Sequence, residues 1–74
     1  MAGFRFEIKE QIGVIAVAKN GWKKELNLVS FNGATPKYDI REWDPNHEQM
    51  SRGVTFSDSE MLNVYGMLKE RFDK

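Results

Sequence analysis

Only the last part of this chain has the residue spacing of a helix, and this most restricts what the chain can fold into. The segment Ser57-Asp58-Ser59-Glu60 fits a capping box, in which Ser57 and Glu60 bond to each other's backbone amides. The apolar residues that follow share one helical stripe: Met61, Val64, Tyr65, Leu68 and Phe72, widened by Leu62 and Met67. The sequence therefore predicts an α+β fold, with several strands followed by one C-terminal helix.

The segments before the helix have the apolar spacing of strands, some half-buried and one more deeply buried. They span residues 4–8, 12–18, 22–31, 37–43 and 53–56, and we expect the first two to join through a bend at 11–13. Asn20-Gly21 predicts a tight hairpin turn with positive φ at both residues. Residues 32–36 and 44–51 are expected to be loops, so the sheet has four to five strands.

The small size of the chain predicts one domain, residues 1–74, with a modest core. Because the sequence has no cysteine, disulfides and thiolate metal clusters are excluded as reinforcement. The apolar arc of the helix is wider than one sheet needs. Either the helix simply buries more apolar surface than it needs, or a second copy packs against it in a two-fold contact. The second alternative predicts a homodimer through the helices.

The sequence offers little that could carry out catalysis. His47 is the single histidine and is expected to be a solvated loop residue. We find no P-loop, no dinucleotide-binding glycine pattern and no nucleophile elbow, so we expect no enzyme, cofactor, metal or small-molecule substrate. The N-terminus lacks the apolar run of a signal peptide and no window reaches the length of a membrane span, so we expect a cytoplasmic protein without membrane contact.

One face of the predicted sheet combines aromatic and basic side chains. Strand alternation separates this face from Leu26, Leu28, Tyr38 and Ile40, which we expect to form the core under the helix. The opposite face carries Lys23, Asn27, Phe31, Lys37, Arg41 and Trp43. Such a surface suits single-stranded nucleic acid, because bases stack on rings while cations neutralise phosphates. The alternative is an ordinary solvated face, with Trp43 under the 44–51 loop and Phe31 covering the core.

Three segments, in order and at near-matching spacing, resemble the positive cofactor 4 family of transcriptional coactivators. They are Tyr38-Asp39-Ile40-Arg41-Glu42-Trp43, the preceding Ser30-Phe31-Asn32-Gly33, and Arg52-Gly53-Val54-Thr55-Phe56 before the capped helix. The small bacterial YdbC-like branch is the most similar, and the resemblance runs from about Ile8 to Phe72. It implies a strongly curved antiparallel sheet and one helix, dimerisation through the helices, and single-stranded DNA binding with little sequence preference.

The resemblance also implies roles for individual residues. Phe31 matches the family's stacking phenylalanine, Arg41 its strand arginine, and Trp43 the tryptophan that closes the motif, although a further aromatic residue before it is missing here. Lys37 takes the place of a basic residue that opens the same strand. Together with Lys23, Lys24 and Asn27, these residues form the predicted nucleic-acid site of a nucleoid-associated protein.

The resemblance does not extend to every property of the family. The serine-rich regulatory tail of the eukaryotic members is absent, so transcriptional coactivation is not carried over. Two other functions stay open: binding of single-stranded RNA, since stacking does not sense the 2′-hydroxyl, and docking of a partner protein on the aromatic face.

Overall fold

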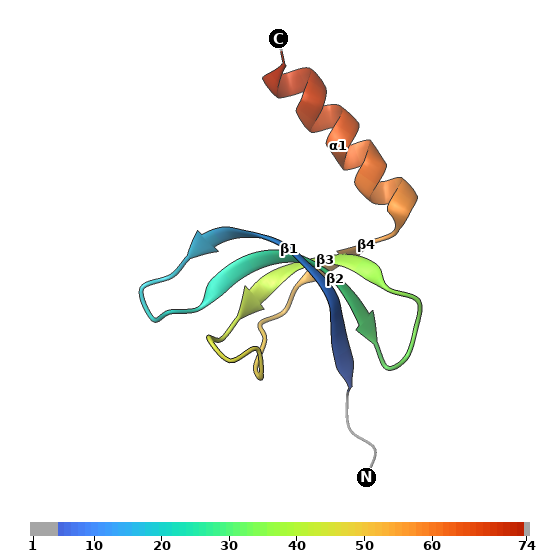
Figure 1. Cartoon of the computed structure of the whole chain (residues 1–74). Coiled ribbons are helices and arrows are strands. Elements are labelled where there is room, and N and C mark those ends of the chain that lie inside the picture. The colour runs from blue at the N-terminus through green and yellow to red at the C-terminus, as the bar shows by residue number, and fades with distance from the viewer. Residues whose placement is uncertain (1–4, 74) are drawn as a thin grey trace.

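The protein folds into one antiparallel sheet followed by a single helix (Figure 1), which confirms the predicted α+β fold. The computed structural model describes residues 5–73, so the predicted strand start at Phe4 lies outside the described residues. The sheet has the strand order β1-β2-β3-β4. The elements are β1 (Phe6–Val17), β2 (Lys23–Phe31), β3 (Lys37–Trp43), β4 (Val54–Phe56) and α1 (Asp58–Phe72).

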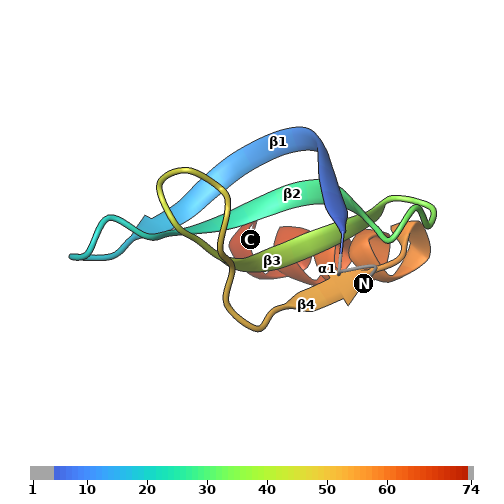
Figure 2. The same ribbon diagram turned by 90° about the horizontal axis from the view of Figure 1, so that it is seen from below.

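Strand β1 is a single bulged strand. Its register against β2 shifts between Ile8 and Glu10, between Gln11 and Gly13, and between Val14 and Ala16. The second shift coincides with the bend that the sequence predicts at 11–13. Each bulge inserts one extra residue and bends the strand. Three bulges in twelve residues account for the strong curvature of β1 in Figures 1 and 2.

The first hairpin turn differs in type from the predicted one. The chain reverses at Asn20-Gly21 as expected, but Gly21 has positive φ there and Asn20 does not. The Gly21 amide donates to the Ala18 carbonyl at 3.0 Å, as in a type I turn followed by a left-handed glycine. Positive φ at two successive residues occurs instead at Asn32 (53°) and Gly33 (79°), in the turn between β2 and β3.

The alternation along β2 and β3 is as predicted. The sequence prediction, however, placed the wrong face of these strands in the interior. The inner face, defined by Glu25, Asn27, Val29, Asp39 and Trp43, is buried, with Val29 and Trp43 at 0% exposure. The outer face, defined by Leu26, Leu28, Tyr38 and Ile40, is only half-buried. The expectation that Asn27 and Trp43 stand in solvent is therefore wrong.

The inner face is buried because the curved sheet closes on itself there. Phe6 pairs with Phe31 at one end of β2, whereas Trp43 pairs with Lys23 at the other end. Even so, the rings of Phe6 and Trp43 lie 5.0 Å apart between centroids. The Asp44–Ser51 loop also lies on the side of the sheet away from the helix (Figure 2). The core of the domain thus forms within the concave side of the sheet.

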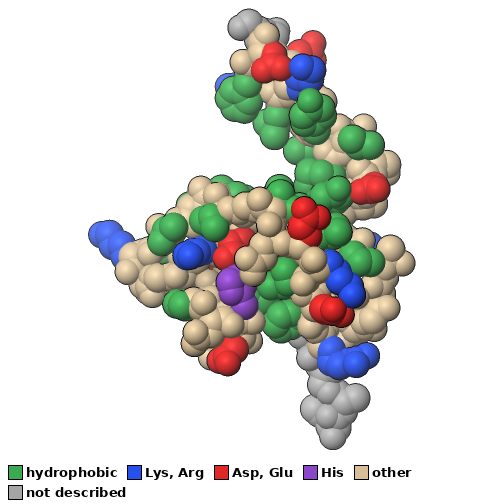
Figure 3. All heavy atoms as spheres, viewed as in Figure 1, with side chains coloured by type: hydrophobic (Ala, Val, Ile, Leu, Met, Phe, Trp, Pro, Cys, Tyr) green, Lys and Arg blue, Asp and Glu red, His purple; other side chains and the backbone are tan. Residues whose placement is uncertain are grey.

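The helix lies almost free of the sheet. Its capping box is as predicted, because Ser57 Oγ accepts from the Glu60 amide and a Glu60 carboxylate oxygen accepts from the Ser57 amide. Among the strands of residues 5–73, the helix contacts β3 and β4, and none of the helix residues is buried. Apolar side chains gather along it in Figure 3. Within residues 5–73, no helix has both the length and the apolar character to cross a bilayer.

Candidate nucleic-acid interface

Phe31 provides a partly accessible aromatic ring at the end of β2. Strand β2 ends there because Asn32 and Gly33 both adopt positive φ and turn the chain. The ring is half-buried, and the Arg41 guanidinium lies over it with Cζ 4.8 Å from the ring centroid. A cation in this position is attracted to the negative face of the ring. Phe31 and Trp43 were the two rings predicted to be exposed, and of these Phe31 keeps accessible surface.

Arg41 is held rigidly by a buried carboxylate. Its Nε lies 2.8 and 2.9 Å from the two carboxylate oxygens of Asp39, and its Nη2 lies 2.7 Å from Oδ2. The Asp39 side chain is fully buried and that of Arg41 is only 13% exposed. The Arg41 Nη1 contacts Met50 Sδ at 3.1 Å. Asp39 thus largely neutralises the charge of Arg41. The main effect of this ion pair is to hold the guanidinium over Phe31.

Gly53 allows the chain before β4 to approach Arg41 closely. A Cβ built on Gly53 would lie 2.4 Å from Arg41 Cβ and 2.6 Å from the Ile40 carbonyl oxygen. Real Cβ atoms do not approach backbone that closely, so any larger residue forces the chain apart. Gly53 is therefore a positioning residue for Arg41.

Trp43 and Asn27, both predicted to contact nucleic acid, lie in the interior. Trp43 is 0% exposed and packs against Phe6, while the His47 ring centroid is 5.7 Å from its own. Asn27 is 1% exposed and donates from Nδ2 to Glu25 at 2.9 Å. Both side chains are therefore shielded from solvent in this arrangement.

His47 anchors the Asp44–Ser51 loop and is not the solvated loop residue that the sequence predicts. Its Nε2 lies 3.0 Å from both carboxylate oxygens of Glu25, which is 4% exposed. Asp44 orders the start of this loop, because its Oδ1 accepts from the amides of Glu48 and Gln49. The Gln49 amide, with a smaller effect of the Glu48 amide, lowers the pKa of Asp44 below its ordinary value of 3.8.

The predicted lysines are exposed but do not form one cluster. Lys37 begins β3 and pairs with Val29, so it lies at the same end of the sheet as Phe31. Lys23 pairs with Trp43 at the other end. Lys24 pairs with Glu42 and belongs to the outer face by alternation. Of the predicted site residues, Arg41 therefore contacts Phe31, and Lys37 lies at the same end of the sheet.

The sequence interpretation missed the residues that support this group. Asp39 and Arg41 are two residues apart in one strand, so strand alternation already placed them side by side on one face. Glu25 also falls on that face, but its contact with His47 depends on a loop whose path the pattern does not define. The packing of Phe6 on Trp43 depends on the bulges in β1.

The close approach at Gly53 leads to a specific prediction. The Gly53→Ala variant is expected to lower the free energy of unfolding by about 1–3 kcal/mol, because the new methyl group overlaps Arg41 and strand β3. Urea denaturation followed by circular dichroism measures this change. Gly13→Ala is the matched control in β1, because its Cβ would meet nothing within 4 Å. Equal destabilisation by both variants would contradict the role of Gly53 in allowing the close approach to Arg41.

Comparison with known proteins identifies the family. Residues 18–64 match the sequence pattern of the family described as Transcriptional Coactivator p15 (PC4), a stretch that includes β2, β3 and β4 but not β1. The chain is also 37% identical over 65 residues to an uncharacterized protein of Treponema pallidum (strain Nichols), covering 88% of this chain and 76% of that protein. The PC4 family is known for binding single-stranded DNA. Because the match covers more than half of the chain, the protein belongs to the PC4 family.

Proposed function

We propose that this protein binds single-stranded DNA with little sequence preference and catalyses no reaction. A base stacks on Phe31, and lysines neutralise the phosphates around it. The observation that supports this most directly is the half-buried Phe31 ring, held under Arg41 at the end of the sheet. Stacking on an aromatic ring tolerates any base, since every base has a π-face.

The cations divide into two groups in this proposal. Lys37 is exposed at the same end of the sheet as Phe31 and contacts the phosphate next to the stacked base. Lys23 and Lys24 are exposed at the other end of β2 and add attraction along a longer strand. Arg41 already bonds to Asp39, so it acts mainly by fixing the face of the Phe31 ring.

Asn27 and Trp43 take a supporting part in the proposed site. Asn27 bonds to Glu25, which holds His47 and with it the Asp44–Ser51 loop. Trp43 fills the space that the curved sheet encloses. Both residues therefore preserve the curvature that places Arg41 over Phe31.

Substitution of Phe31 tests the proposal. Phe31→Leu keeps an apolar side chain of similar volume but removes the aromatic face, so it is expected to weaken binding of a labelled oligo(dT) by about 1–3 kcal/mol. Phe31→Tyr keeps the face and should bind like the parent. Fluorescence anisotropy with oligo(dT), oligo(U) and a duplex of equal length measures all three ligands.

The same titrations distinguish the alternatives. Preference for oligo(U) over oligo(dT) would assign the site to single-stranded RNA. Absence of binding to every oligonucleotide would instead favour a protein partner. If Phe31→Leu binds oligo(dT) as tightly as the parent does, stacking at this position is wrong.

We also propose that the protein is a homodimer through its helix. The outer face of the sheet is half-buried, and the helix exposes large apolar side chains in solution. These are Leu62 (68% exposed), Tyr65 (60%), Met67 (67%), Leu68 (47%) and Phe72 (73%). Exposed apolar surface of this extent on a small domain is typical of an interface. A second copy of the same helix and outer face would cover it in a two-fold contact.

A charge in the helix tests this assembly. Leu68→Asp is expected to halve the mass measured by sedimentation equilibrium, because the carboxylate would be buried between the two copies. Ser59→Asp adds the same charge to the exposed first turn of the helix, away from the apolar stripe, and should leave the dimer intact. A parent protein that sediments as a folded monomer would contradict the proposal.

A further inference from the structure

Trp22 is an aromatic ring with accessible surface at the end of β2 away from Phe31. It directly precedes β2 and is half-buried, whereas Trp43 is fully buried. Within residues 5–73, the Trp22 ring contacts no other aromatic ring, and its indole N–H donates no hydrogen bond. Both a ring face and a donor are therefore available to a ligand at this end of the sheet.

The turn between β1 and β2 holds the backbone of Trp22 in place. The Trp22 amide donates to Asn20 Oδ1 at 3.0 Å, and the Trp22 carbonyl accepts from the Ala18 amide at 2.7 Å. A Cβ on Gly21 would lie 3.6 Å from Pro45 Cγ, so the turn also rests against the loop after β3. A ring on such an ordered backbone loses little freedom when a base stacks on it.

Three lysines flank this ring. Lys19, Lys23 and Lys24 are exposed, and none of them forms an ion pair within residues 5–73. By strand alternation, Lys24 falls on the same side as Trp22, and Lys23 falls on the other side. Figure 3 shows basic side chains at the left, where this hairpin lies in Figure 1. The turn thus combines a ring with positive charge that no carboxylate binds, which suits single-stranded nucleic acid.

The helix of the same chain does not cover this turn. Among the strands of residues 5–73, the helix contacts β3 and β4. In both Figure 1 and Figure 2, the turn between β1 and β2 projects beyond the end of the helix. A nucleic acid can therefore reach Trp22 without displacing the helix.

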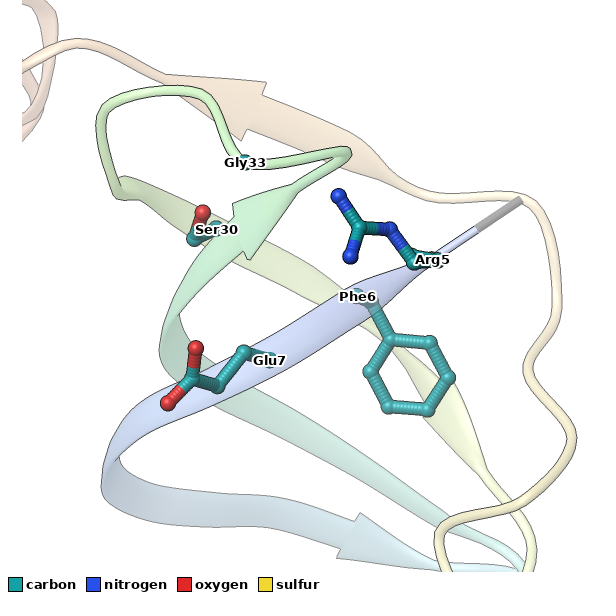
Figure 4. A pocket seen from close by; sticks show the side chains of 5 residues that line it. All are labelled: Arg5, Phe6, Glu7, Ser30 and Gly33. Carbon is teal, nitrogen blue, oxygen red and sulfur yellow. The ribbon is translucent and has the colours of Figure 1, made fainter. Parts of the chain in front are cut away.

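The end of β2 that carries Phe31 offers few cations to a nucleic acid. In the hollow at this end, the Arg5 side chain extends toward Gly33, whereas the Phe6 ring points to the other side of β1 (Figure 4). Because Phe6 pairs with Phe31, the Arg5 guanidinium lies on the opposite face of the sheet from the Phe31 ring. A long strand that stacks on Phe31 therefore needs cations elsewhere, and the lysines of the first turn are exposed.

We propose that the turn between β1 and β2 is a second single-strand contact, in which a base stacks on Trp22 while Lys19 and Lys24 bind neighbouring phosphates. This inference rests on the proposed function but concerns a different nucleotide from the one at Phe31. The nine residues of β2 separate the two rings by about 30 Å of extended chain. Alternation also places the two rings on opposite sides of the strand. None of the three segments that resemble the family contains Trp22.

Substitution of Trp22 in the full chain tests this inference. Trp22→Leu removes the ring and is expected to weaken binding of a long oligo(dT) about 5-fold, the lower end of the range for one stacked base, because the ring is half-buried. Trp22→Phe keeps an aromatic face and should bind much like the parent.

A charge variant tests the phosphate contact. Lys19→Gln should reduce the slope of log affinity against log salt by about 0.7, the value for one phosphate on a single strand. Arg71→Gln removes the same charge from the exposed last turn of the helix and should retain the parent slope. Melting curves followed by circular dichroism show whether each variant is folded.

Tryptophan fluorescence gives an independent readout. A base that stacks on an indole quenches its emission, and Trp43 is buried, so oligo(dT) should quench the parent but not Trp22→Phe. Because the two contacts are separate, Phe31→Leu should still be quenched at saturating oligo(dT). This comparison decides the matter even where Trp22→Leu does not fold.

The outcomes separate this inference from the function on which it rests. If the parent binds oligo(dT) and folded Trp22→Leu binds it equally tightly, the role of Trp22 is wrong while the proposed function stands. Equal quenching of the parent and Trp22→Phe would contradict that role as well. If the parent binds no single strand, both are wrong.

Discussion

The contact between Phe6 and Trp43 is the interaction on which the rest of the structure depends. These rings belong to opposite ends of β2 in the strand register, yet their centroids are 5.0 Å apart. Only a strongly bent sheet can bring them together, and the three bulges in β1 supply that bend. The contact turns the concave side of a four-stranded sheet into a core, which a flat sheet of this size could not enclose. Strand β1 therefore contributes directly to this core, although it lies outside the family match.

The two faces of the sheet differ in composition and burial. The inner face is filled by Trp43 and Val29 together with the paired polar groups Asp39–Arg41 and Glu25–His47. Buried charges are tolerated there because each has a close partner. The outer face and the helix keep apolar side chains accessible, which is unfavourable for a single chain in water. The rim between the two faces carries Phe31 and Lys37, the ring and the cation of the proposed nucleic-acid site.

The sequence predicted the elements better than their packing. The capping box at Ser57, the β3 strand and the alternation along β2 depend on local spacing, and the structure has all three. The interior was assigned wrongly because Leu26 and Leu28 are more apolar than Asn27 and Glu25, and alternation alone does not say which face closes. The bond between the Arg5 amide and Asn32 could not be predicted either, because it depends on the register of β1 and on the Asn32–Gly33 turn, which no local pattern defines.

Hydrogen exchange of the two indole N–H groups tests the central claim most directly, because Trp43 is fully buried and Trp22 is half-buried beside the first hairpin turn. Exchange is followed by two-dimensional NMR of the ¹⁵N-labelled protein, with the signals assigned by replacing Trp22 with phenylalanine. A core on the concave side predicts that the Trp43 indole exchanges only through opening of the folded subunit, and far more slowly than that of Trp22. Equally fast exchange of both indoles would place Trp43 in solvent and contradict this account of the fold.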